Sequence, residues 1–372
     1  MNQQAMSYTI VSVHESDSDY RDIFHFLKEN WSRPVLLSDE KFVRWQFEDN
    51  PDDLGNNPSL LVLSADGKVM GFLGLNHRPF YVDGQKRRGA ELTTWIISEK
   101  LRGQGIGKAM MTKISKENDI VMGMGISEIA LPIYLDLGFR YLRAIPRFYK
   151  VLDLAHVATF SKIEPLGYRL IEKRSNPAVL PKGVEIVDVT LDSGFSSELN
   201  EHARSFNGYS RDLEWLEWRY GRHPYFQYSF NRLTMGDYSA LLITRLDISP
   251  NAKVMHLIDI IGAGSILAKV PVATEVLARE KGAQLVDVHC TSTRITAPFW
   301  AAGWLSAMDD TYVQIPHLFH PLELRSPATT SLIMFGRTNL SNITDLSSLY
   351  VTKGDCDFDR PTYQTLKDME VC

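Results

Sequence analysis

The stretch that most constrains the fold of this chain is E-L-T-T-W-I-I-S-E-K-L-R-G-Q-G-I-G-K-A, residues 91–109. Its first half is apolar and β-branched, which is typical of a strand. Three glycines, Gly103, Gly105 and Gly107, then lead into a helical pattern. Alternate glycines let the backbone approach a bound group closely, and the free N–H groups at the start of a helix favour an anion such as a pyrophosphate. The sequence therefore predicts a strand, an anion-binding loop and a helix.

The length of 372 residues indicates about two domains, at roughly 150 residues per domain. A net charge of −5 argues against binding to duplex nucleic acid. The start of the chain lacks the pattern of a secretory signal, and no apolar stretch reaches membrane-spanning length. The cysteines, Cys290, Cys356 and Cys372, are odd in number and too widely spaced to suggest a disulfide framework or a metal site. We expect a cytoplasmic protein that binds no metal, membrane or nucleic acid; the sequence does not specify its oligomeric state.

The elements expected around the loop form a recognisable order. Periodicity and turn signals predict strands, helices and a final strand region in this order: strand 8–14, helix 19–30, a second helix from 38, strands 59–64, 69–75, 79–82 and 91–97, helix 108–116, strand 120–126, helix 133–137 and strand region 140–152. With an R-x-x-G-x-G loop after the central strand and Y-L-D-L-G-F further on, residues 8–152 resemble the GNAT superfamily of CoA-dependent N-acyltransferases. A Rossmann dinucleotide fingerprint, G-x-G-x-x-G, is excluded, because the glycines run G-x-G-x-G after an antiparallel meander.

The resemblance implies acyl-CoA, either acetyl-CoA or a short hydroxyacyl-CoA, as cosubstrate. It also implies that the end of the central strand, at Ile97 and Ser98, pairs with the pantetheine and polarises the thioester carbonyl. Tyr134 stands where many members keep a tyrosine that protonates the departing thiolate, and Glu91 where some members place the general base. The residues implied to hold the pyrophosphate are Arg102, Gly103, Gln104, Gly105, Ile106, Gly107 and Lys108.

The chemistry supports these residue types independently. Attack by an amine on a thioester needs a carboxylate that removes a proton, and a phenol near the sulfur can return one. Donors aimed at the developing oxyanion supply electrostatic stabilisation. Each residue also has a structural interpretation: Glu91 as a carboxylate that faces solvent at a strand end, and Tyr134 as a ring that packs beside Leu137 and Phe139.

The second half of the chain repeats the first weakly but in the same order. The matching pairs of fragments are 45–51 with 218–224, 71–75 with 240–246, 91–97 with 256–262, and 137–139 with 302–304. The predicted fold class is therefore mixed α+β, with two tandem GNAT-like domains, each a twisted, mainly antiparallel mixed sheet flanked by helices. The expected divisions are a domain at 1–152, a linker at 153–183, a degenerate domain at 184–340 and a tail at 341–372.

The second copy lacks the features that the first copy has at the loop. It reads G-A-G-S-I-L-A-K where the first copy has its glycines, and Phe299 stands where Tyr134 would. We therefore expect one CoA site, in the first copy, and a wall for the acceptor in the second. Six polar or aromatic residues of this wall could bind a sugar or base, with packing in the core as the alternative: Trp218, Tyr220, His223, His256, Asp259 and His289.

The tail carries aspartates at 355, 357 and 359. An EF-hand is rejected, because Arg360 and Leu366 occupy the positions that need glycine and glutamate. We expect a solvated acidic loop, with a substrate-binding loop as the alternative.

A tandem GNAT of this kind resembles bacterial N-acyltransferases that modify nucleotide-linked amino sugars, such as dTDP-3-amino-3,6-dideoxyhexoses, for surface polysaccharides. The expected partner is thus a small-molecule amine, with direct attack on the thioester. Two alternatives stay open. One is an N-acetyltransferase that acts on a protein, a peptide or another small amine; the other is a non-catalytic CoA-binding protein.

Overall fold

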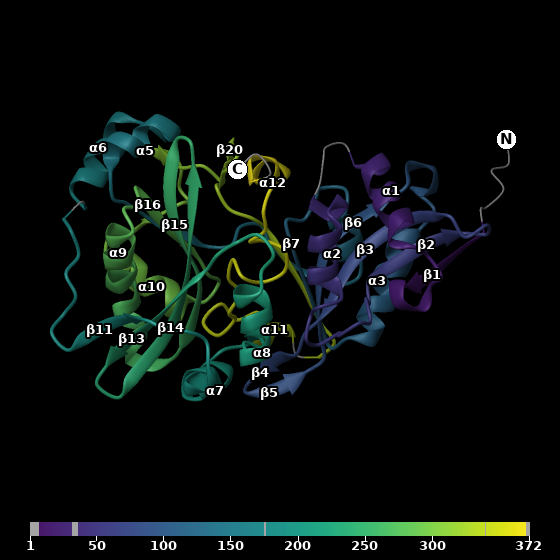
Figure 1. The fold of residues 1–372 in the computed structure, drawn as a ribbon, viewed down its shortest axis with the longest axis horizontal. Helices are drawn as coiled ribbons and strands as arrows, with labels where there is room; N and C mark the ends of the chain where they lie inside the picture. Colours follow the sequence, from purple (N-terminus) through teal and green to yellow (C-terminus); the bar gives the residue numbers. More distant parts are fainter. Residues whose placement is uncertain (1–6, 32–35, 175, 339, 370–372) are drawn as a thin grey trace.

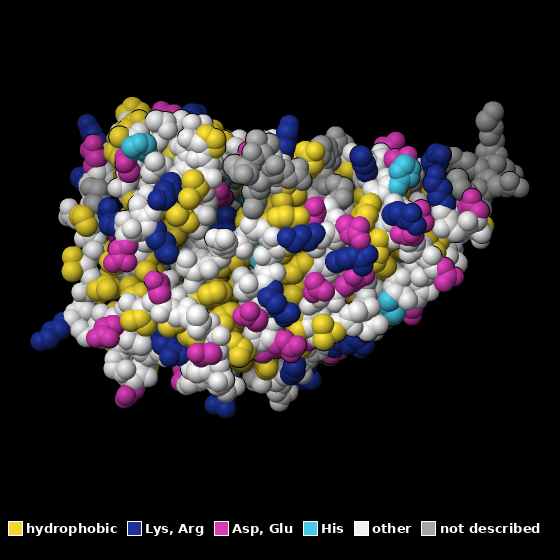
Figure 2. All heavy atoms as spheres, in the orientation of Figure 1, with side chains coloured by type: hydrophobic (Ala, Val, Ile, Leu, Met, Phe, Trp, Pro, Cys, Tyr) yellow, Lys and Arg dark blue, Asp and Glu magenta, His cyan; other side chains and the backbone are white. Residues whose placement is uncertain are grey.

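The computed structural model describes residues 7–31, 36–174, 176–338 and 340–369, so Cys372 lies outside the described residues. Two seven-stranded mixed sheets stand beside one another, each flanked by helices, and the yellow C-terminal part of the chain runs between them (Figure 1). This architecture confirms the predicted mixed fold with two tandem GNAT-like domains. On the face shown in Figure 2, basic and acidic side chains are interspersed, as the nearly balanced totals of 40 and 45 suggest.

The first sheet is antiparallel except for one parallel pair, β6 with β7. Its helices pack on two faces: α1 and α2 share one apolar cluster with β3, and α3 and α4 share another with β6. In sheet order the strands are β1 Tyr8–Ser12, β2 Leu60–Ser64, β3 Val69–His77, β6 Gly89–Ile97, β7 Ile120–Met124, β21 Leu332–Gly336 and β8 Arg140–Leu142; the helices are α1 Tyr20–Asn30, α2 Glu40–Phe47, α3 Ile106–Glu117 and α4 Leu131–Asp136.

The second sheet repeats this plan, with one parallel pair, β15 with β16. In sheet order its strands are β11 Val184–Asp188, β13 Ser229–Met235, β14 Tyr238–Ser249, β15 Ala252–Gly262, β16 Leu285–His289, β9 Arg147–Val151 and β17 Leu305–Ser306. The helices packed around it are α7 Ser196–Ser205, α8 Leu213–Leu216 with a π-helical turn Glu217–Gly221, α9 Val270–Glu280 and α10 Thr293–Ala301.

The two sheets exchange one strand each. β9 follows β8 in the chain but leaves the first sheet and pairs between β16 and β17 of the second. In return, β21 from the second half pairs between β7 and β8 of the first sheet. The expected strand region 140–152 is therefore split between the two sheets. A cut at residue 152 does not separate them, and the domain boundaries as folding units stay a prediction.

The duplication is visible in the details of strand pairing. Glu91 pairs with Met122 in the first sheet, and His256 pairs with Asp287 at the same step of the second. Two residues further on, each central strand carries a bulge, at 93–94 in β6 and at 258 in β15. Bulges of this kind re-aim a strand near a site. The fragments 91–97 and 256–262, which the sequence comparison aligned, are thus structurally equivalent.

The equivalent tryptophans of the two copies meet at the domain interface. The rings of Trp45 and Trp218 stack with centroids 5.0 Å apart and planes inclined by 19°. Each indole N–H donates to the main-chain oxygen of the other residue, at 3.2 and 2.9 Å. Such reciprocal contacts are what an approximate two-fold axis produces. The surrounding apolar cluster includes residues of both sheets, so the two domains share one core.

Short strands and helices add further contacts between the two halves of the chain. Residues 153–183 contain α5 Leu154–Phe160, β10 Lys162–Ile163 and α6 Pro165–Glu172, helices that are too short to show a sustained sequence period. β12 Gly208–Tyr209 of the second half joins β4 Phe80–Val82 and β5 Gln85–Arg87 in a three-stranded sheet. The other strands and α-helices are β18 Val313–Gln314, paired with β10, the β19 Leu318–Phe319 and β20 Leu322–Glu323 pair, α11 Leu340–Ile343 and α12 Tyr363–Met369.

Candidate acyl-transfer site

The site begins where β6 and β7 separate. The two strands pair in parallel only from Gly89 to Leu92 of β6, whereas β6 continues to Ile97. Over the described residues, the β7 side of residues 93–97 has no partner strand. Gly74 of β3 permits the bulge at this point, since a Cβ there would lie 2.1 Å from Thr93 Oγ1. The structure thus leaves an open strand edge directly before the glycine loop.

Ile97 and Ser98, which we predicted to face the pantetheine, differ in what they offer. The Ser98 N–H donates to Met70 O at 2.9 Å, so it is already used within the sheet. Backbone groups of successive residues in a strand point to opposite sides. The N–H of Ile97 therefore points to the open edge, and this residue is the one able to donate to a thioester oxygen there.

The loop after β6 presents a row of free amides. None of the N–H groups of residues 103–108, all within the described part of the chain, donates to a backbone or side-chain acceptor, and the first bond of the helix runs from Ala109 N to Gly105 O. Gly103 and Gly105 have φ of 78° and 76°, in the left-handed region that glycine adopts without strain. A Cβ on either would meet no atom within 4 Å. The loop therefore combines an uncapped helix of 12 residues with open space above it, which suits a phosphate group.

Gly107 has a different role from the other two glycines. A Cβ at this position would lie 2.9 Å from Cζ2 of Trp95 and 3.1 Å from Cδ1 of Ile133. Its lack of a side chain lets α3 pack closely on β6 and α4. The three glycines of the sequence motif thus divide into two that shape the loop and one that allows packing.

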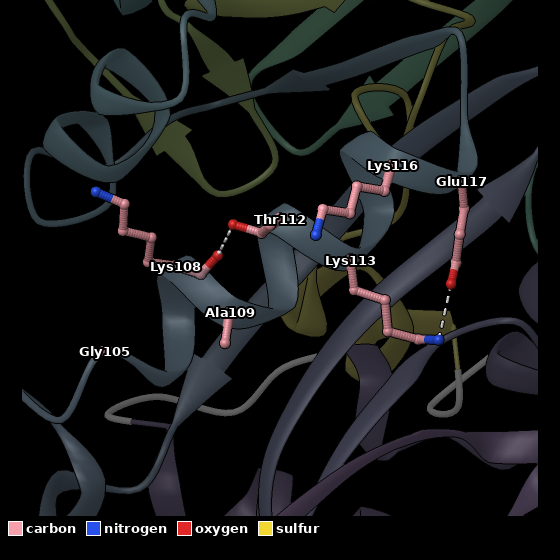
Figure 3. A pocket seen from close by; sticks show the side chains of 7 residues that line it. All are labelled: Gly105, Lys108, Ala109, Thr112, Lys113, Lys116 and Glu117. Carbon is pink, nitrogen blue, oxygen red and sulfur yellow. Dashed lines mark hydrogen bonds and ion pairs between the residues drawn. The ribbon is translucent and has the colours of Figure 1, made fainter.

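Basic side chains surround the loop at the surface. Arg102 forms an ion pair with Glu99 at 3.2 Å, and Lys108 forms one with Asp136 at 3.5 Å. A shallow cavity of about 590 Å³ runs from Gly105 along the outer face of α3 (Figure 3). Lys108, Lys113 and Lys116 line it, and Lys113 bonds to Glu117. This trough continues from the free amides and carries mainly positive charge.

Glu91 lies at the point where β6 and β7 part, and only 3% of the residue is exposed. Its Oε1 accepts from Arg78 Nη1 at 2.6 Å and from the backbone N–H of Cys356 at 3.4 Å. Burial raises the pKa of Glu91 above its usual value, although Arg78 acts against this. The carboxylate is therefore enclosed, which corrects the alternative of a strand-end group that faces solvent.

Tyr134 on α4 is also buried, at 3% exposed. Its ring packs edge-on against Trp95 and Phe139, with centroids 5.6 and 5.1 Å away. Among the described residues, no group forms a hydrogen bond with its hydroxyl. Burial raises the pKa of Tyr134, and the nearby thiol of Cys356 would raise it further if ionised. Cys356 is thus a neighbour of both Glu91 and Tyr134.

The acidic tail is not the solvated loop that we expected. Asp355 is 0% exposed and Asp359 is 1% exposed, because both form buried ion pairs with arginines. Asp359 bonds to Arg245 at 2.8 Å. The segment 350–359 passes between the domains and contacts both central strands: the Cys356 N–H donates to Glu91 of β6, and the Tyr350 hydroxyl donates to Asp259 of β15. The sequence analysis did not place Arg78, Asp355 or Cys356 in the site. The pattern D-C-D-F-D at 355–359 was the one signal for the two tail residues, and Arg78 had none.

Three residues that we predicted to bind the acceptor belong to the interface core. Trp218 stacks on Trp45, and Tyr220 donates to Asp259 at 3.0 Å. Asp259 also pairs with Arg211 at 3.1 Å. All three are at most 3% exposed, so no ring or carboxylate among them faces a solvent-accessible space that could hold a sugar.

The three predicted histidines are buried as well. His223 Nδ1 accepts two backbone N–H groups of the following turn, and burial lowers its pKa to about 2. His256 Nδ1 lies 2.5 Å from Asp287. Burial, followed by the charge of Arg147, lowers the pKa of His289 well below its usual value. The structure therefore places these residues within the second domain and not around the free amides of the first.

The second domain confirms the difference that the repeat predicted. A 3-10 helix, Gly264–Lys269, replaces the glycine loop before α9. Phe299 packs edge-on against Trp304 with centroids 4.8 Å apart, as Tyr134 packs against Phe139. The fold is retained there, whereas the loop and the phenol are not.

Comparison with known proteins agrees with this geometry. Residues 20–136 match the family model described as the acetyltransferase (GNAT) family. The first domain therefore has the fold and the loop of an acyl-CoA-dependent N-acyltransferase. No curated protein matches the sequence significantly.

Solved structures show a similar arrangement of both domains. A GCN5-related N-acetyltransferase from Anabaena variabilis ATCC 29413 superposes with a TM-score of 0.57 at 12% identity, over 90% of this chain and 74% of that one. One from Kribbella flavida gives 0.53 at 14% identity, over 88% and 71%. N-myristoyltransferase of Saccharomyces cerevisiae, with bound myristoyl-CoA, gives 0.50 at 12% identity, over 93% and 84%. At these identities the likeness concerns the fold.

Within the described ranges, no group of three or more His, Cys, Asp or Glu side chains is arranged to hold a metal ion. Of the helices in the same part of the chain, none has the length and apolar character needed to span a bilayer.

Proposed function

We propose that this protein transfers a short acyl group, acetyl or hydroxyacyl, from CoA to the amino group of a small molecule, and that the reaction takes place in the first domain. The observation that carries the proposal is the row of free N–H groups at 103–108 beside the open edge of β6. Free amides at a helix start favour a pyrophosphate. An open strand edge can pair with the amide groups of a pantetheine arm as with an added strand.

Glu91, Ile97 and Tyr134 could together support direct transfer of the acyl group from the thioester to an amine. Glu91 would remove a proton from the ammonium group of the acceptor, directly or through one water, so that the neutral amine can attack the thioester carbonyl. The raised pKa of Glu91 suits a general base. The Ile97 N–H would donate to the oxygen that develops negative charge. Tyr134 would return a proton to the departing thiolate, because its hydroxyl has no other partner in the described structure.

For the acceptor we propose a nucleotide-linked amino sugar, such as a dTDP-3-amino-3,6-dideoxyhexose used for surface polysaccharides. This finer proposal rests on the resemblance of the sequence to tandem enzymes of that kind. The burial of Trp218 and Tyr220 means that other residues would have to contact the sugar.

The test uses the full chain with acetyl-CoA or a 3-hydroxyacyl-CoA and a panel of dTDP- and UDP-linked amino sugars. Free thiol is measured over time and product mass is determined, with peptides and simple amines as the comparison panel. We expect thiol release that depends on an amino sugar. Turnover only with peptides would reject the sugar acceptor, and tight binding of acetyl-CoA without turnover on any amine would reject the enzyme.

A further inference from the structure

Arg78 is held from three directions beneath the acyl-transfer site. The residue is 1% exposed. Its Nη1 donates to Glu91 Oε1 at 2.6 Å and to Asp355 Oδ1 at 2.9 Å. Its Nε and Nη2 both donate to Ser210 O, and its guanidinium lies 3.4 Å from the ring centroid of Trp215. Arg78 therefore cannot move toward one carboxylate without losing its other contacts.

Asp355 is fixed as firmly as Arg78. Its second oxygen, Oδ2, accepts from Arg211 Nη2 at 2.7 Å and from the Thr352 N–H at 2.8 Å. Although burial acts to raise it, Arg211 and Arg78 hold the pKa of Asp355 below its usual value. Asp355 thus places a permanent negative charge beside Glu91, 264 positions away in the sequence by subtraction of the residue numbers.

The next residue connects the same segment to Glu91 directly. Cys356 has a φ of 52°, unusual for a residue with a side chain, and its N–H points to Glu91 Oε1. Segment 355–356 therefore contacts Glu91 in two ways, through the charge of Asp355 and through this N–H.

The remaining ionisable groups that face Glu91 keep one charge state. Tyr209 and the Cys356 thiol stay neutral, since burial raises the pKa of each. Arg219 stays cationic, because its pKa is raised by surrounding acidic groups in spite of burial. Glu91 thus shares one guanidinium nitrogen, Arg78 Nη1, with Asp355. A like charge nearby disfavours the ionised form of a carboxyl group.

We infer that Asp355 is a positioning residue that sets the basicity and the orientation of Glu91 through Arg78, so that a segment near the end of the chain completes the site of the first domain. The inference rests on the proposed function, in which Glu91 is the general base. Asp355 touches neither substrate, and it acts only through the groups that hold Glu91.

The experiment compares pH profiles of kcat/KM for the full chain and for Asp355→Asn. Removal of the neighbouring negative charge makes Glu91 easier to ionise, so the acid limb should move to lower pH by about one unit. The maximal rate should fall by about 3- to 10-fold, because Glu91 becomes a weaker base. Asp357→Asn is the matched control: Asp357 pairs with Arg360 at 2.6 Å and does not contact Arg78. Its acid limb should stay in place.

A purely structural role of Asp355 would lower the rate at every pH and leave the limb unmoved, which would overturn the inference. Acetyl-CoA affinity and thermal unfolding report whether the variant is folded. If Asp355→Asn does not fold, Asp355→Ser replaces it, because this variant also removes the charge and leaves Arg211 in place to pair with Asp259. It should show the same shift.

Glu91→Gln separates this inference from the proposed function. If it keeps the wild-type rate and acid limb, the assignment of Glu91 as base fails, and with it the inference. If it loses the limb while the folded Asp355 variants retain it in place, the base stands and only the role of Asp355 fails.

Discussion

The side chain of Tyr134 combines tight ring packing with a hydroxyl that forms no hydrogen bond among the described residues. Tyr134 packs tightly between Trp95 and Phe139, yet its hydroxyl has no hydrogen-bond partner in the described part of the chain. The hydroxyl is therefore available to a thiolate that arrives with the substrate.

We therefore expect Tyr134→Phe to keep its fold and to lose about 100-fold in kcat, since the missing proton donor is the only change. The loss should be smaller at low pH, where water supplies protons more readily. Steady-state kinetics across pH, with thermal unfolding as the control for the fold, will measure it. A rate equal to wild type at every pH would remove Tyr134 from the mechanism.

The glycine motif between β6 and α3 has two structural roles, one in the shape of the loop and one in the packing of the helix. Gly103 and Gly105 open the loop, whereas Gly107 lets α3 approach Trp95. The motif as read from the sequence assigned all three to a ligand. Distances to Trp95 and Ile133 separate them, and no sequence pattern contains those distances.

For Gly107→Ala we expect a loss of about 1–3 kcal/mol of unfolding free energy, because the new methyl group overpacks against Trp95. Gly103→Ala meets no neighbouring atom, so its cost is that of a left-handed residue, about 1 kcal/mol, and its main effect should fall on acetyl-CoA affinity. Urea unfolding and calorimetric titration test both variants. A stable Gly107→Ala with weakened acetyl-CoA binding would contradict the packing role.

The sequence was most informative where structure is local. The strand, loop and helix at 91–109 and the matching central strand of the second copy follow from short-range patterns and from self-comparison. The exchange of β9 and β21 could not be foreseen, because each is a five-residue strand whose partners lie far along the chain. The burial of the acidic tail could not be foreseen for the same reason, because charged residues are buried only when they are paired and the partners of the tail lie far along the chain. The arginine partners of Asp355, Arg78 and Arg211, are distant in sequence.

Several histidines of the molecule are buried, and burial lowers the pKa of each of them. Burial, followed by the charge of Arg211, lowers the pKa of His202 to about 4. Burial, followed by Arg147, lowers that of His317 to about 3. An unfolded histidine titrates near pH 6.5. Below that pH the unfolded chain binds protons that the folded chain does not bind.

Stability should therefore be complete above about pH 6.5 and should fall as the pH drops toward 4, by about 1.4 kcal/mol per pH unit for each such histidine. Urea unfolding at several pH values will measure the slope. His202→Gln should make it shallower by the contribution of one proton. His25→Gln, at a position with a 69% exposed side chain, should leave it unchanged. An equal slope in all three proteins would refute this account.

The exchange of strands also fixes an order of events during synthesis. β21 comes from the last tenth or so of the described chain, yet it lies between β7 and β8 of the domain made first. Until the ribosome has released it, β7 has an unpaired edge, and the first domain lacks both the strand next to β7 and segment 355–356. Exposed edges invite wrong pairing. The half of the molecule that is translated first is thus the half that is finished last.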